Sequence, residues 1–210
     1  IRDRSYENAL FVGDILSSGY WGAELCEIQK GDTVAVIGAG PVGLCSMMSA
    51  KLLGAEKIIA IDVDDTRLEI AKNQNLADVV INPLNSDVEK EVKDLTERRG
   101  ADSVIEAAGG KDTFQTAWKI ARANAIVALV AMYEENQTLP LPDMYGKNLT
   151  FKTGGVDGCD CGEILQLIEE GKIDTAPLIT HTYLLSEIDR AYDLFENKRD
   201  GVMKVAVSMN

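Results

Sequence analysis

Short apolar runs alternate with longer amphipathic segments over most of the chain. The runs are continuous series of Val, Ile, Leu and Ala, as is typical of strands that are buried on both faces. The pattern predicts strands at residues 33–38, 57–61, 79–81, 103–106, 126–130 and 149–152. It predicts helices between them at residues 41–53, 65–73, 88–98 and 113–121. This alternation predicts an α/β fold with a doubly wound, six-stranded parallel sheet and flanking helices.

The pattern changes after residue 131. Residues 134–145 are polar and contain two prolines, which predicts a loop. Beyond it we expect a helix, an extended segment, a helix capped by Ser186 and a final strand, at residues 163–170, 177–185, 186–197 and 202–207. The last of these elements lie outside the alternating pattern, which favours packing on a different domain.

A glycine-rich turn joins the first predicted strand to the first predicted helix. It reads Gly38-Ala39-Gly40-Pro41-Val42-Gly43, a G-x-G-x-x-G pattern in the required strand–turn–helix context. In such a turn the first glycine permits the tight bend, the second lets the backbone approach a pyrophosphate, and the third lets the helix pack closely on the sheet. The helix N-terminus offers N–H groups to the anion. We therefore predict a Rossmann dinucleotide site that includes Pro41 and Val42.

An acidic residue stands where this site needs one. Asp62 ends the second predicted strand, nineteen residues after Gly43, where a carboxylate would bind the adenosine ribose hydroxyls. Asp62 could instead cap the next helix, but Asp64 and Asp65 suit that role better. Arg67 is expected to lie along the adenine. Since a 2′-phosphate would meet this acidic group, the sequence predicts NAD over NADP.

A methyltransferase is a competing interpretation, because such domains also carry a glycine loop after the first strand and an acid after the second. Two features argue against it. The third glycine, Gly43, opens the helix here, and no acid precedes the loop within its strand.

Composition narrows the function further. The 210 residues are 46% hydrophobic and 26% charged, which is ordinary for a globular chain. Lys and Arg total 21 against 34 Asp and Glu, a net charge of −13. So acidic a surface repels phosphate backbones and anionic lipids, which argues against nucleic-acid or membrane binding. The sequence has no apolar run of about 18 residues, the length of a membrane-spanning helix.

Cysteine and histidine usage limits the possible chemistry. Cys26 and Cys45 lie in apolar segments and are expected to be small buried side chains, while Cys159 and Cys161 are expected to be thiols of a cytoplasmic protein. His181 is the only histidine, so a Ser-His-Asp or multi-histidine metal site made by this chain alone is disfavoured. No catalytic residue is predicted. The chain starts at Ile1 rather than Met, and we expect that an N-terminal part is missing.

Three motifs together resemble the zinc-dependent medium-chain alcohol dehydrogenases, over nearly the whole chain. They are GDTVAVIGAGPVG at residues 31–43, GADSVIEAAG at 100–109 and DGVMKV at 200–205. The segment GDILSSGYWGAE at 13–24 resembles the secondary alcohol dehydrogenase branch. The resemblance implies the end of a catalytic domain and a linker helix at 1–24, an NAD-binding Rossmann domain at 25–175, and a return to the catalytic domain at 176–210.

The resemblance also implies site residues. Asp14 matches an aspartate that binds the catalytic zinc in that branch, and Ser18 matches a hydroxyl residue that touches the nicotinamide. The loops at 107–109, including Ala108, and at 131–133, including Met132, are implied to line the cofactor, as is 153–155. The family's Cys and His zinc ligands belong to the N-terminal domain, so zinc is expected only in the full-length protein.

The implied activity is hydride transfer between a small-molecule alcohol and NAD, in a cytoplasmic homodimer or homotetramer, with this chain alone inactive. Two alternatives stay open: a non-catalytic NAD-binding module, and a zinc-free quinone reductase of the same superfamily, which Asp14 disfavours.

Overall fold

A computed structural model describes residues 5–156 and 158–209 and divides the chain into two compact units. One unit comprises Ser18–Asp157, and the other comprises Ile1–Ser17 together with Gly158–Asn210. The helix α2 (Ile15–Leu25) runs across this division. None of the helices in the described part of the chain is long and apolar enough to cross a bilayer.

The larger unit is built on one six-stranded sheet in the order β3-β2-β1-β4-β5-β6, and every pairing in it is parallel. The predicted doubly wound parallel sheet is therefore confirmed. Its strands are β1 Thr33–Ile37, β2 Lys57–Ile61, β3 Val79–Ile81, β4 Ala101–Glu106, β5 Ala121–Leu129 and β6 Thr150–Thr153. The central strands are buried on both faces, which explains their continuous apolar sequence.

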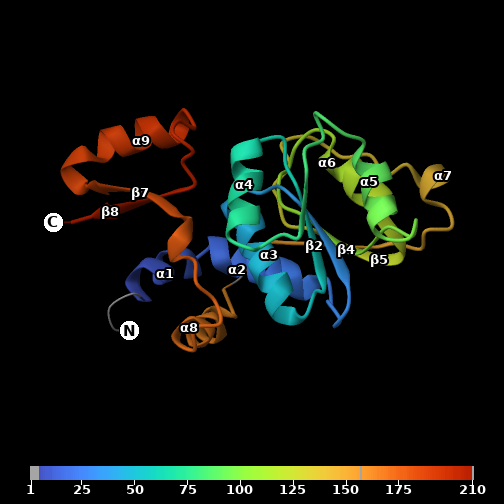
Figure 1. Ribbon diagram of the computed structural model, residues 1–210, viewed down its shortest axis with the longest axis horizontal. Helices are drawn as coiled ribbons and strands as arrows, with labels where there is room; N and C mark the ends of the chain where they lie inside the picture. The colour runs from blue at the N-terminus through green and yellow to red at the C-terminus, as the bar shows by residue number, and fades with distance from the viewer. Residues whose placement is uncertain (1–4, 157, 210) are drawn as a thin grey trace. The chain divides into compact units, whose positions relative to one another are not determined.

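Helices cover both faces of this sheet. They are α3 Pro41–Leu53, α4 Asp65–Asn73, α5 Val88–Leu95 and α6 Thr113–Ile120. Figure 1 shows α3 and α4 on one side of the strands and α5 and α6 on the other. The helix ends follow local chemistry: α3 starts at Pro41 and is followed by Gly54 in the left-handed conformation, while the carboxylates of Asp64 and Asp87 cap α4 and α5.

The smaller unit combines both ends of the chain. Its elements are α1 Ser5–Val12, α8 Cys161–Glu169, the 3₁₀ turn η1 Ala176–Leu178, β7 Ile179–Leu184, the 3₁₀ turn η2 Leu185–Glu187, α9 Ile188–Glu196 and β8 Lys204–Ser208. Strands β7 and β8 pair in parallel. The Asn8 side chain joins α1 to the start of η1, because its Oδ1 accepts hydrogen bonds from the Thr175 hydroxyl at 2.7 Å and the Ala176 N–H at 3.1 Å.

Three predicted elements need correction. Ser186 does not cap a helix: it lies inside the η2 turn, and α9 begins after Glu187. The predicted loop at 134–145 contains the one-turn helix α7 (Leu141–Met144), since Pro142 fits the first turn of a helix. The fifth strand starts at Ala121 rather than Ile126, directly after α6, because an irregularity in its pairing with β4 absorbs the polar residues between.

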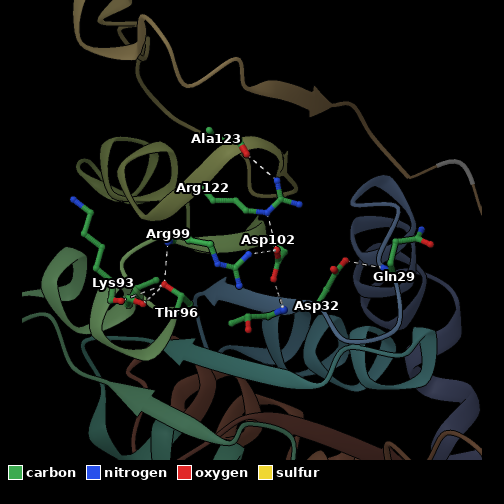
Figure 2. Close-up of polar contacts among 11 residues, drawn as sticks. Gln29, Asp32, Lys93, Thr96, Arg99, Asp102, Arg122 and Ala123 are labelled. Carbon is green, nitrogen blue, oxygen red and sulfur yellow. Dashed lines mark hydrogen bonds and ion pairs between the residues drawn. The ribbon is translucent and has the colours of Figure 1, made fainter.

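A nearly buried carboxylate holds the amino-terminal edge of the sheet together. The Asp102 side chain, 13% exposed, accepts a hydrogen bond from the Thr33 N–H at 2.8 Å and one from Arg122 Nε at 2.6 Å (Figure 2). The Arg122 guanidinium also donates to the Ala123 carbonyl at 2.7 Å. Asp102 on β4 thus ties the first residue of β1 to the irregular segment of β5.

Asp102→Ala is expected to lower the free energy of unfolding by about 1–3 kcal/mol, because it leaves the Thr33 N–H and the Arg122 Nε–H without their acceptor. Urea unfolding measures this loss. Glu89→Ala is the matched control: it removes an exposed ion pair with Lys93 and should cost no more than about 0.5 kcal/mol. Equal losses of unfolding free energy in the two variants would show that the Asp102 contacts stabilise the fold no more than an exposed ion pair does.

Candidate cofactor site

A groove of about 470 Å³ opens at the carboxyl-terminal edge of the sheet, within the larger unit. It lies where β1 is flanked by β2 and β4, which is the point at which the strand order reverses. Open α/β sheets bind their ligands at this position. The groove is lined by Ile37, Gly38, Gly40, Pro41, Val42, Ile61, Asp62, Val63, Arg67, Pro83, Ala107, Ala108, Gly110 and Thr113. Seven predicted site residues are thereby brought together.

The glycine turn has the geometry that its sequence requires. Gly38 has φ +99°, and a Cβ there would lie 3.0 Å from the backbone carbon of Ala107. Gly40 is the N-cap of α3, has no side chain to occupy the helix end, and accepts the Leu44 N–H at 2.9 Å. The first N–H groups of a helix lack partners within the helix, so an anion in the groove would find donors here.

Gly43, on the first turn of α3, packs directly against the backbone of Gly38. A Cβ on Gly43 would lie 1.8 Å from the Gly38 carbonyl oxygen and 2.8 Å from the Gly38 carbonyl carbon. Both atoms belong to the backbone, so they cannot rotate away as a flexible side chain would. Gly43 therefore fixes how closely α3 approaches the glycine turn.

Asp62 is held at the groove by backbone donors. Its half-buried carboxylate accepts the Ala39 N–H at 2.6 Å through Oδ2 and the Asp64 N–H at 2.9 Å through Oδ1. Since each carboxylate oxygen has two acceptor positions, both can accept a further hydrogen bond from a ligand. The cap of α4 is Asp64, which accepts the Thr66 N–H at 2.9 Å, so Asp62 is not needed for that role.

Arg67 lies over the glycine turn. A Cβ on Gly40 would come within 3.5 Å of its Nη1, and its Nε lies 3.6 Å from Asp64 Oδ2. The guanidinium thus borders the groove beside the N-terminus of α3, with one carboxylate partner of its own.

Glu106 is a site residue that the sequence reasoning missed. It ends β4, is fully buried, and accepts the N–H groups of Ala108 and Gly109, both at 2.9 Å, through Oε1. Its Oε2 accepts the Tyr133 hydroxyl at 2.6 Å. A signal was present in the sequence, because Glu106 follows the buried apolar pair Val104 and Ile105 and directly precedes the loop.

A second pocket of about 350 Å³ adjoins Ala108. It is lined by Ala108, Gly109, Lys111, Met132, Tyr133, Glu134, Glu135 and Gln137. Met132 is 94% exposed here, so it lies in this second pocket rather than against the groove floor. Burial, with the hydrogen bond to Glu106 as the next cause, raises the pKa of Tyr133 far above its ordinary value, so its hydroxyl remains a donor.

Two further predicted residues lie near the N-terminus. Ser18 is half-buried on α2, which packs closely on α3: a Cβ on Gly19 would lie 2.6 Å from the Cβ of Cys45. Asp14 directly precedes α2 and is exposed. The third implied loop lies beside the same helix, since a Cβ on Gly154 would meet the Trp21 ring at 3.4 Å.

The described residues do not fit a complete zinc site. Across 5–156 and 158–209, no three His, Cys, Asp or Glu side chains gather closely enough to hold a metal ion. A catalytic zinc needs about three protein ligands.

Two of the cysteines are core side chains. Cys26 and Cys45 are buried, as predicted. Burial raises the pKa of Cys26 to about 12, which keeps it a protonated, unreactive thiol.

A family model described as zinc-binding dehydrogenase matches residues 41–170. The chain is 42% identical over 206 residues to an alcohol dehydrogenase of Cupriavidus necator, covering 96% of this chain and 56% of that protein. It is 34% identical over 210 residues to the NADP-dependent isopropanol dehydrogenase of Thermoanaerobacter brockii, covering 96% and 59%.

A solved structure also matches this chain. The alcohol dehydrogenase TADH from Thermus sp. ATN1 superimposes with a TM-score of 0.90 at 35% identity, covering 97% of this chain and 59% of that one. The chain therefore spans little more than half the length of the proteins that it matches.

Proposed function

The chain belongs to the zinc-binding dehydrogenase family, and from that membership we propose that it is the cofactor-binding part of an enzyme that transfers hydride between a small alcohol and NAD. The observation that carries the proposal is the groove at the switch point of the sheet, with the glycine turn and Asp62 on its walls. NAD, when bound, supplies the hydride acceptor. The chain's own residues bind and orient it.

In this proposal, residues around the groove and the second pocket hold the different parts of the dinucleotide. The glycine turn and the α3 N-terminus would hold the pyrophosphate, where a Cβ on Gly38 or Gly40 would narrow the groove. Asp62 would accept the ribose hydroxyls, and Arg67 would lie along the adenine. Ala108 and Met132 would lie towards the nicotinamide, and Ser18 is proposed to touch it.

We propose NAD rather than NADP, although the relative from Thermoanaerobacter brockii is named as NADP-dependent. Here Asp62 faces the groove, and Asp64 and Asp65 follow it within three residues. Arg67, the cation beside them, already pairs with Asp64. A 2′-phosphate would be placed against a carboxylate with no unshared cation among these residues, which is unfavourable by several kcal/mol.

Titration calorimetry of the chain with NADH and NADPH tests the proposal. We expect NADH to bind, and to bind at least ~30-fold more tightly than NADPH. A chain that binds neither dinucleotide would overturn the proposed function. Tighter binding of NADPH would overturn the choice of cofactor and leave the family intact.

The zinc, alcohol and assembly proposals concern the whole protein. We propose Asp14 as this chain's ligand to a zinc whose other ligands lie outside the chain. We propose a homodimer or homotetramer, supported by the two sheet edges that β3 and β6 leave. A cytoplasmic location is supported by four cysteines that carry thiols.

A further inference from the structure

Two loops that border the proposed cofactor site are joined through one buried side chain. The loop after β4 begins with residues 107–110, and the loop after β5 begins with residues 130–133. The side chain of Glu106 accepts two N–H groups of the first loop and the Tyr133 hydroxyl of the second. Its backbone carbonyl accepts the N–H groups of Val130 and Ala131, at 2.8 and 3.1 Å. A single residue therefore bonds to both loops with its side chain, and again to the second with its backbone.

The contacts suit an ionised carboxylate. Three donors point at its two oxygens, and an ionised carboxylate has acceptors only. Hydrogen bonds to a charged group are among the stronger ones in proteins, and Glu106 is fully buried. Tyr133 is the sole side-chain donor of the three, so it is the contact that a substitution can remove cleanly.

The two loops are also packed against one another. Gly109 has φ +66°, and a Cβ there would lie 2.6 Å from the Met132 carbonyl oxygen. Ala108 borders both the groove and the second pocket, while Met132 and Tyr133 border the second pocket. A shift of either loop would therefore change the wall that the two pockets share.

This wall belongs to one half of the dinucleotide site. A Rossmann sheet is made of two mononucleotide-binding halves, and Asp62 and Arg67 stand on the half that takes the adenosine. Glu106 and Tyr133 stand on the β4–β6 half. We propose, on the basis of the proposed function, that Glu106 acts with Tyr133 as a positioning residue that shapes the nicotinamide half of the site and leaves the adenylate half unaffected.

The test compares NADH with ADP, which lacks the nicotinamide half. In Tyr133→Phe, one oxygen of Glu106 loses its donor while the ring stays in place. We expect NADH affinity to fall by about 5- to 10-fold, the effect of leaving a buried charged acceptor short of one hydrogen bond. ADP affinity should stay within about twofold, since ADP does not reach this wall. Calorimetry gives both dissociation constants.

Tyr145→Phe is the matched control, because Tyr145 is 94% exposed and the same hydroxyl is removed. It should change neither affinity. Glu106→Gln should repeat the NADH-selective loss more strongly, and if that variant does not fold, Tyr133→Phe decides alone. Parallel loss of NADH and ADP, or unchanged NADH affinity in Tyr133→Phe, would overturn the positioning role. A parent chain that binds neither ligand would overturn the proposed function itself, and this role with it.

Discussion

Asp62→Ala is expected to lower NADH affinity by about 10- to 100-fold, because the ribose hydroxyls lose their charged acceptor. NADPH affinity should rise or hold, since the carboxylate that opposes a 2′-phosphate is gone. The preference for NADH should therefore relax towards equality. Titration calorimetry with both dinucleotides measures the two changes on one protein sample.

The different responses of the NADH and NADPH affinities separate loss of the ribose contact from damage to the glycine turn. Asp62 also accepts the Ala39 and Asp64 N–H groups, so the variant loosens the glycine turn to some degree. Loosening alone would weaken NADH and NADPH together, since both carry the same pyrophosphate. Loss of the ribose contact weakens NADH selectively.

Asp65→Ala is the matched control for charge. Asp65 lies on the first turn of α4, is exposed, and carries the same negative charge near the same groove. Its removal should shift both affinities slightly and in the same direction. If Asp62→Ala behaves like Asp65→Ala, Asp62 acts only as one charge among several and the assignment of NAD loses its basis.

Much of the larger unit could be predicted from sequence because its signals are local. Each buried strand is a continuous apolar run, and the turn at Gly38 and the cap at Asp64 depend on residues within one or two turns of each other. The prediction that Ser186 caps a helix was wrong because it also used local pattern alone. A serine before an apolar periodic run is typical of a cap, but here the chain first makes the η2 turn. Local pattern does not distinguish a 3₁₀ turn from the start of an α-helix.

The site residues also differ in whether their positions depend on local sequence or on distant partners. The positions of the glycine turn and Asp62 at the groove could be predicted because strand, turn and helix fix them, while their roles in binding stay predictions. Glu106 could not be given a role, because its partner Tyr133 lies 27 residues away on another loop, and the register of β4 with β5 decides whether they meet. Asp14, Ser18 and the domain boundaries at 24/25 and 175/176 stay predictions, since they depend on the family resemblance.

Gly43→Ala is expected to abolish measurable NADH binding and to lower the free energy of unfolding by about 1–3 kcal/mol or more. The added methyl would overlap the Gly38 carbonyl, at 1.8 Å, and α3 also packs closely on α2, where a Cβ on Gly19 would lie 2.6 Å from the Cβ of Cys45. The glycine turn must therefore move away from the helix. Because this turn forms the pyrophosphate wall of the groove, the same displacement that costs stability also removes the binding geometry.

Gly162→Ala gives the matched control, since Gly162 also lies in a helix, α8, but a Cβ there would meet nothing within 4 Å. Alanine should stabilise that helix by about 0.5–1 kcal/mol and leave NADH binding unchanged. We therefore expect thermal unfolding to show stability changes of opposite sign for the same glycine-to-alanine substitution. Calorimetry should show a loss of NADH binding in Gly43→Ala alone. A Gly43→Ala protein that unfolds and binds NADH like the parent chain would show that α3 can withdraw from the turn. The close contact would then not be what shapes the groove, and the turn's own backbone conformation, set by φ +99° at Gly38, would have to account for it.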